Sequence, residues 1–150
     1  MAMTMIGAVQ LPAPREVVWQ KLNDAEVLKA CIPGCEELVK TSDIQFKAVA
    51  VSKIGPVKAR FKGNVHLADL DPPNGYKISG EGDGGMAGFA KGAATVILTD
   101  KDGGTLLTYN VEAQIGGKMA QLGQRLVNGA AKKVADDFFA NFAKAVLSGS

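Results

Sequence analysis

Apolar and polar residues alternate along much of the middle of the chain. From Val57 to Leu67, apolar or small side chains take every second position, and charged or polar ones fill the positions between. A period of two is typical of a β-strand with one buried face. The same pattern, broken by Gly, Pro, Asn and Asp turns, predicts strands over residues 4–11, 37–40, 44–51, 57–67, 76–82, 89–99 and 105–115.

Two short helices are expected after the first strand. Pro12 and Pro14 favour a helix start, because proline suits a first turn whose amide needs no partner. Residues 23–24, Asn-Asp, are typical of the cap of a second helix, which the Ile-Pro-Gly of residues 32–34 ends.

A long helix is expected near the C-terminus, over about residues 117–147. Apolar residues recur there at steps of three and four, the pattern of a helix that lies on an apolar surface. They are Met119, Leu122, Leu126, Ala130, Val134, Phe138, Phe142 and Val146. Polar residues fall largely on its other faces: Gln124, Asn128, Lys132, Asp136 and Lys144.

The order of elements predicts one α+β domain over residues 1–150. A curved antiparallel sheet has one apolar face to cover, and the C-terminal helix is the only long amphipathic element available. The sheet should therefore wrap around that helix with a space between them, which is the helix-grip architecture.

Charge and cysteine content exclude several classes of site. The net charge is +2, from 17 Lys and Arg against 15 Asp and Glu, which is too small a bias to indicate nucleic-acid binding. Cys31 and Cys35, with one histidine in the chain, cannot form an ordinary four-ligand zinc site. We expect two reduced cysteines that pack structurally, no metal and no resident cofactor. A redox pair is the weaker alternative, because the spacing is not Cys-x-x-Cys.

The sequence predicts a cytoplasmic protein. Residues 1–10 lack the basic start and long apolar run of an export signal. Every apolar run is broken well before the roughly 18 residues that a membrane-spanning helix needs.

No side chain stands out as catalytic. His66 falls on the polar side of its strand, where a solvated surface histidine is expected. Glu81 and Asp83 are two apart on a strand and share a face, but that face is also the polar one. The glycine-rich residues 80–88 are not followed by a helix or by Gly-Lys-Ser/Thr, so we interpret them as a flexible hairpin rather than a phosphate loop.

An apolar cavity between sheet and helix is the main candidate site. Small residues expected to face the helix could leave space for a lipophilic ligand: Ala48, Ala50, Ala59, Gly63, Gly80, Ala90, Ala94 and Ala113. The expected lining comprises Phe46, Phe61, Tyr76, Phe89, Tyr109, Met119, Leu122 and Leu126. Tyr76 and Tyr109 could offer hydroxyls to a ligand carbonyl. The alternative is that these large side chains fill the space as a packed core.

A basic stripe is expected on the other face of the sheet. Lys58, Arg60 and Lys62 alternate with apolar residues and therefore share one side of their strand. A solvated outer sheet face explains this stripe most simply. A docking surface for an acidic partner or for anionic lipid headgroups is the functional alternative.

Several local patterns together resemble the carbon monoxide dehydrogenase G-subunit family, within the START-like (SRPBCC) superfamily. They occur in order and cover about residues 5–142. The patterns are MIG at 5–7 with PAPREVVW at 12–19, LND at 22–24, CIPGC at 31–35, IGPVKARFKG at 54–63, GFAKG at 88–92 and GGKMAQLG at 116–123.

The resemblance implies an accessory role beside an aerobic carbon monoxide dehydrogenase or a related molybdenum hydroxylase. It implies binding of a quinone or lipid, with membrane recruitment or delivery of an electron acceptor. Longer members continue into a C-terminal tail that can hold the membrane, so here we expect at most a transient peripheral contact. The alternatives are a START-like cyclase or hydrolase acting on a hydrophobic substrate, and a docking scaffold without a ligand.

Overall fold

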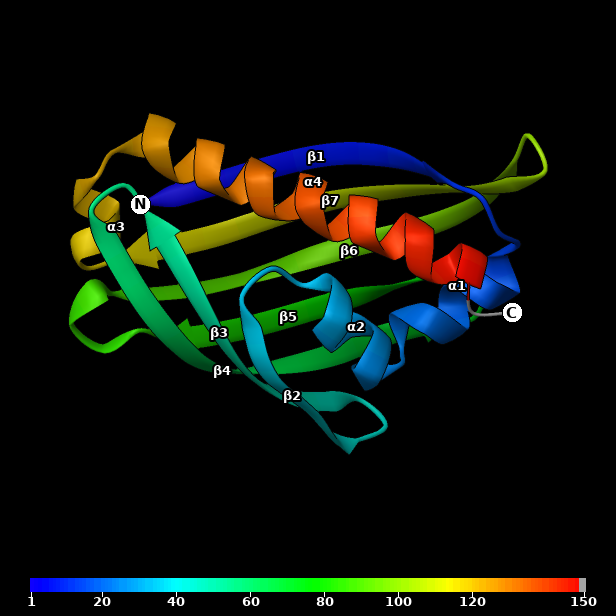
Figure 1. The fold of residues 1–150 in the computed structure, drawn as a ribbon, viewed down its shortest axis with the longest axis horizontal. Coiled ribbons are helices and arrows are strands. Elements are labelled where there is room, and N and C mark those ends of the chain that lie inside the picture. Colours follow the sequence, from blue (N-terminus) through cyan, green and yellow to red (C-terminus); the bar gives the residue numbers. More distant parts are fainter. Residues whose placement is uncertain (149–150) are drawn as a thin grey trace.

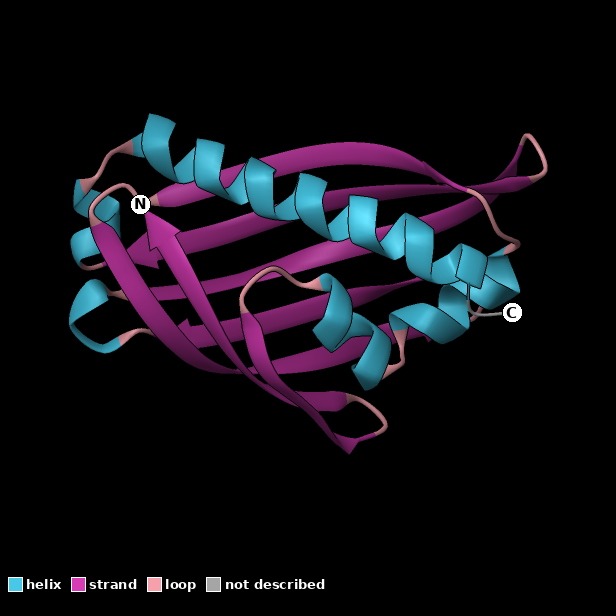
Figure 2. Ribbon diagram, in the orientation of Figure 1, coloured by secondary structure: helices cyan, strands magenta, loops and turns pink. Residues whose placement is uncertain are grey.

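One antiparallel sheet forms the body of the protein. The computed structural model describes residues 1–148, and its seven strands follow the order β1-β7-β6-β5-β4-β3-β2 (Figure 1). The strands are β1 (Ala2–Leu11), β2 (Cys35–Ser42), β3 (Gln45–Ile54), β4 (Val57–Asp71), β5 (Gly75–Asp83), β6 (Phe89–Lys101) and β7 (Gly104–Gly116). The sheet curves around a long helix, so the α+β helix-grip prediction is confirmed (Figure 2).

The helices are α1 (Arg15–Leu22), α2 (Ala25–Cys31), α3 (Lys118–Gln121) and α4 (Gln124–Ser148), with a 3-10 turn η1 at Gly85–Ala87. The start of α2 follows the predicted cap, because the Asp24 carboxylate accepts hydrogen bonds from the amides of Glu26 and Val27. The glycine-rich residues 80–88 end β5 and include the 3-10 turn η1 of the β5–β6 hairpin, where Asp83 Oδ1 accepts a hydrogen bond from the amide of Gly85 at 2.8 Å.

The prediction of one continuous helix over about residues 117–147 is wrong in one respect. Helix α3 ends at Gln121, and Gly123, with a φ of 94°, separates it from α4. A left-handed residue cannot continue a right-handed helix. The break resets the helical phase, so Val127 is buried at 4% exposure whereas the predicted Leu126 is 43% exposed.

The faces of the strands follow the predicted alternation. On β4, Ala59 and Leu67 are buried against the helix side, whereas Lys58, Arg60 and Lys62 are exposed on the outside. Strand β4 therefore presents one apolar face to α4 and one polar face to water.

Two separate clusters of buried side chains hold the helix on the sheet. The larger cluster includes residues of α1, α2, the sheet and the C-terminal half of α4. Leu11 of β1, Leu107 of β7 and Phe142 of α4 are among its most buried members, all at most 1% exposed. The smaller cluster packs Met119 and Val127 near the start of α4. Between the two clusters the inner face of the sheet carries small side chains, and this is where space remains.

The two cysteines are both free. Cys31 is buried at the end of α2, and burial raises the pKa of its thiol. Cys35 is half-buried, and its Sγ lies 3.5 Å from the carbonyl oxygen of Glu37. Over residues 1–148, no helix is both long and apolar enough to cross a membrane.

Candidate functional site: an apolar cavity between sheet and helix

A cavity of about 380 Å³ lies between the inner face of the sheet and α4. Helix α2 and strand β2 close it on one side through Leu28, Ile32 and Leu38. Its lining is apolar apart from two tyrosines: Met5, Leu22, Leu28, Ile32, Leu38, Phe46, Val65, Leu67, Tyr76, Ile78, Ala94, Val96, Leu107, Tyr109, Val111, Ala131, Val134, Ala135, Phe138 and Phe139. A lining of this kind suits a lipophilic molecule with few polar groups.

A second hollow extends the apolar surface along the sheet. It has a volume of about 280 Å³ and shares Val65 with the cavity. Small residues of five strands line it, including Ala48, Ala50, Gly63, Gly80, Gly82, Ala90, Gly92 and Ala113. Many of these are the small residues that the sequence places opposite the helix, and we call this hollow the glycine-alanine groove.

Three of the eight expected lining residues lie in the cavity, namely Phe46, Tyr76 and Tyr109. Phe61 lines the glycine-alanine groove instead. Met119 is 3% exposed and packs in the smaller core cluster, and Leu122 is half-buried at the end of α3.

Two expected lining residues point elsewhere. Phe89 is 51% exposed, and its ring lies against Gly116 on the outer face of the sheet. Phe89 and Ala90 are neighbours on one strand, so only one of them can face the helix, and Ala90 does. Leu126 lies over Gly55 at the β3–β4 turn because of the break at Gly123.

Sequence reasoning misses the residues that close the cavity. The sequence identifies Leu28 and Ile32 only as parts of a short helix and its end, and Leu38 only as part of a strand. Helix α2 is held over the cavity by a hydrogen bond in which Asn141 Nδ2 on α4 donates to the carbonyl oxygen of Cys31 at 3.0 Å. No local pattern signals such a contact, which joins residues 110 positions apart.

Tyr76 is the most deeply buried polar group of the cavity. It is 5% exposed, and its ring packs edge-on against Trp19 with centroids 5.1 Å apart. Among residues 1–148, no group forms a hydrogen bond with its hydroxyl. Burial raises the pKa of this phenol well above its usual range. The hydroxyl therefore stays protonated and remains available as a donor to a ligand.

We expect Tyr76→Phe to make the protein more resistant to alkali. The folded state holds the phenolic proton that the unfolded chain loses above about pH 10, so wild-type stability falls as the pH rises beyond that value. Urea unfolding at about pH 7 and about pH 11 measures the effect. The variant should match the wild type at neutral pH and lose less stability at alkaline pH; equal losses would contradict this assignment.

Tyr109 closes the opposite side of the cavity. Its ring stacks on Phe139 of α4, with centroids 5.3 Å apart and planes at 21°. It also lies over Gly7 of β1, where a Cβ atom would collide with the phenol. Glycine at position 7 therefore leaves the room that this ring occupies.

The polar residues considered as catalytic lie outside the cavity. His66 is exposed on the outer face, and its Nε2 lies 3.0 Å from Nε2 of Gln45. Glu81 and Asp83 are exposed on the same outer face. The expected placement of these three residues on the polar side is confirmed.

The basic stripe is partly neutralised. Arg60 pairs with Glu36 of β2 at 2.9 Å, and Lys62 lies opposite Asp83 in the β4–β5 register. Lys58 lies opposite Lys53 at the end of the β3–β4 hairpin, which leaves the stripe most positive there.

A sheet wrapped around a C-terminal helix, with an apolar cavity between them, defines a protein of the helix-grip class. The chain belongs to the carbon monoxide dehydrogenase G-subunit (CoxG) family, whose sequence profile matches residues 7–147. The resemblance seen in the local sequence patterns is therefore confirmed.

Solved structures support the same assignment of fold. A conserved protein from Geobacillus kaustophilus is 35% identical, with a TM-score of 0.90 over 97% of this chain and 95% of that one. A protein from Rhizobium leguminosarum is 16% identical, with a TM-score of 0.74 over 97% and 95%. The Zhui aromatase/cyclase from Streptomyces sp. R1128 is 11% identical, with a TM-score of 0.70 over 97% and 94%. Among curated proteins, none matches the chain in sequence.

Proposed function

We propose that this protein is a non-catalytic accessory protein that carries a quinone or another lipid in the cavity between sheet and α4. The supporting observation is the cavity itself, about 380 Å³ lined by apolar side chains and two tyrosines. A water-filled space with this lining would be unfavourable, whereas an apolar ligand would gain from leaving water.

Membership of the CoxG family supports a proposal for the enzyme that the carrier serves. We propose that the protein serves an aerobic carbon monoxide dehydrogenase or a related molybdenum hydroxylase, either by delivering its electron acceptor or by recruiting it to the membrane. The exposed Lys58 and Lys62 of the basic stripe would favour contact with an acidic partner or with anionic lipid headgroups. Such contacts keep the protein at the cytoplasmic side of the membrane only transiently.

An enzymatic role is the second candidate. The Tyr76 hydroxyl, protonated and carried by a buried residue of the cavity, and the fold shared with an aromatase/cyclase favour it. However, the described cavity lining contains no carboxylate, histidine or lysine to act as a base. An enzyme of this kind would depend on a tyrosine hydroxyl, so Tyr76→Phe or Tyr109→Phe should abolish turnover. Two Phe variants that function normally would exclude it.

Extraction of a quinone from vesicles tests the proposed carrier function. Liposomes that contain menaquinone are mixed with the protein and sedimented, and the quinone in the supernatant is measured. We expect roughly one quinone per protein, because the cavity shields one apolar molecule from water. A variant with a filled cavity, Ala135→Phe, should leave the quinone in the pellet. Equal supernatant quinone with and without wild-type protein would contradict the proposal.

A second measurement addresses the proposed partner. Purified carbon monoxide dehydrogenase is supplied with quinone-containing vesicles, and quinone reduction is followed with and without this protein. A faster reduction that the Ala135→Phe variant does not support is the expected result. No acceleration by the wild-type protein would exclude electron-acceptor delivery to that enzyme.

A further inference from the structure

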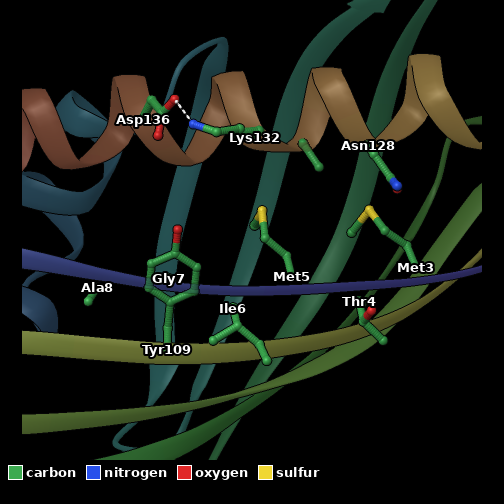
Figure 3. Close-up of a pocket in the computed structure, with 11 residues that line it drawn as sticks. Met3, Thr4, Met5, Ile6, Gly7, Ala8, Tyr109, Asn128, Lys132 and Asp136 are labelled. Carbon is green, nitrogen blue, oxygen red and sulfur yellow. Dashed lines mark hydrogen bonds and ion pairs between the residues drawn. The ribbon is translucent and has the colours of Figure 1, made fainter.

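An opening lies between the edge strand β1 and helix α4. Strand β1 ends the sheet, and α4 runs along it, as Figure 1 shows. The opening has a volume of about 340 Å³ and is lined by β1 residues 3–8, by Tyr109, and by Asn128, Ala131, Lys132 and Asp136 of α4 (Figure 3). We call it the β1–α4 window.

The window and the cavity share a wall. Met5, Tyr109 and Ala131 line both spaces. Figure 3 shows the Tyr109 ring standing between β7 and α4, with its hydroxyl toward the helix. Only Gly at position 7 leaves room for this ring. A molecule in the cavity therefore reaches the window past Tyr109.

The window differs from the cavity in its polarity. Lys132 Nζ lies 2.8 Å from Asp136 Oδ2 on the helix above it, and the hydrogen bond to Asp136 raises the pKa of the Lys132 ammonium, which stays charged. Asn128 also lines this side. Polar side chains, namely the donors Lys132 and Asn128 and the Asp136 carboxylate, thus lie at the window, whereas the cavity lining has no polar side chains besides its two tyrosines.

The apolar space extends along the strands for a considerable length. Along β6, Val96 and Ala94 line the cavity, and Gly92 and Ala90 line the glycine-alanine groove. From Val96 to Ala90 a strand extends roughly 20 Å at about 3.3 Å per residue. A linear isoprenoid or acyl chain fits such a path better than a compact ring system does.

We propose that the β1–α4 window is the subsite for the polar head of the ligand, and that the tail lies in the cavity and the glycine-alanine groove. The head would carry a carbonyl or carboxylate oxygen that accepts hydrogen bonds from Tyr109 Oη and Lys132 Nζ. This inference rests on the proposed carrier function and adds the ligand's direction and chemical class to it.

Two probes test the head subsite separately from the cavity. Short-tail ubiquinone has a carbonyl head, whereas N-phenylnaphthylamine is apolar and reports on the cavity by fluorescence. We expect Tyr109→Phe to weaken ubiquinone binding about 5-fold, the effect of one lost neutral hydrogen bond. Lys132→Gln should weaken it about 3-fold, since this lysine is exposed and screened. Neither change should alter binding of the apolar probe by more than about 2-fold.

The adjacent ion pair provides a matched control. Lys133 lies 2.8 Å from Asp137 with the same spacing, but these two residues do not line the window. Lys133→Gln should therefore leave the affinity for both probes unchanged, although it removes the same charge from the same helix.

The outcomes separate this inference from the proposed function. If wild-type protein binds neither probe, the proposed carrier function and the window assignment are both wrong. If it binds both, and Tyr76→Phe weakens ubiquinone binding while Tyr109→Phe and Lys132→Gln do not, the head lies at the buried end and the window assignment is wrong. Equal losses for Lys132→Gln and Lys133→Gln would also overturn it, because they would indicate a general effect of charge.

Discussion

Ala135→Phe is expected to abolish high-affinity ligand binding and to leave the protein folded. Ala135 lies on the face of α4 that lines the cavity, so a benzyl group there would occupy the space that the ligand needs. A ligand forced against an added ring loses about 1–3 kcal/mol of packing, which corresponds to about 5–150-fold in affinity. Titration with menaquinone or with an apolar fluorophore measures the loss.

The melting temperature of Ala135→Phe shows whether a loss of binding comes from a filled cavity or from a less stable protein. Because the cavity already offers about 380 Å³, the new ring should fit with little change in melting temperature. Ala140→Phe is the matched control, since Ala140 is exposed on the same helix and should not affect binding. Ala94→Leu fills the cavity from the sheet side and should give the same loss of binding. A filled variant that binds as tightly as wild type would place the ligand elsewhere.

Gly88→Ala is expected to be the most destabilising of the single substitutions considered. Gly88 has φ 125° and ψ −161°, a backbone conformation that is essentially restricted to glycine. A Cβ there would also collide with the carbonyl oxygen of Gly116. Strain of about 1–3 kcal/mol together with that collision should cost about 3 kcal/mol or more, and roughly 10 °C in melting temperature.

A neighbouring glycine gives the control for this effect. Gly85 also has a positive φ, 63°, but no atom lies within 4 Å of where its Cβ would be. Gly85→Ala should therefore cost only about 1 kcal/mol, the ordinary cost of the left-handed conformation. Urea unfolding of the two variants measures the difference. Similar losses for both would show that the approach of Gly88 to Gly116 does not matter.

The close approach of Gly88 to Gly116 also explains two of the sequence patterns in physical terms. The GFAKG pattern begins at Gly88, and the GGKMAQLG pattern begins at Gly116. The structure brings these glycines together where β7 passes into α3, and a Cβ at Gly117 would likewise collide with Gly88. Side chains at either place would push α3 away from the sheet.

The fold could be predicted because its main signals are local. A period of two marks the strands, and an amphipathic stretch marks the C-terminal helix, so the order of elements alone leads to the helix-grip arrangement. The division between α3 and α4 depends on a single residue, Gly123, whose left-handed conformation the periodicity does not encode. For that reason the periodicity predicts a continuous helix and assigns Leu126 to the wrong face.

The site could be predicted only in part because it depends on packing between distant segments. Alternation places Phe46, Tyr76 and Tyr109 on the inner face, where they line the cavity. The closing role of Leu28 and Ile32 follows from the docking of α2 against α4, which no local pattern shows. The sequence assigns Lys132 and Asp136 to the polar side of α4, but it does not reveal that this side lies along the edge strand β1.

The central claim is that a hydrophobic molecule occupies the space between the sheet and α4. Native mass spectrometry of protein purified gently from its own host, followed by organic extraction, tests it most directly. We expect about one quinone or lipid molecule per chain, and its absence from the Ala135→Phe variant prepared in the same way. An empty wild-type protein that also fails to take up added menaquinone or ubiquinone would contradict the claim and would favour a docking scaffold.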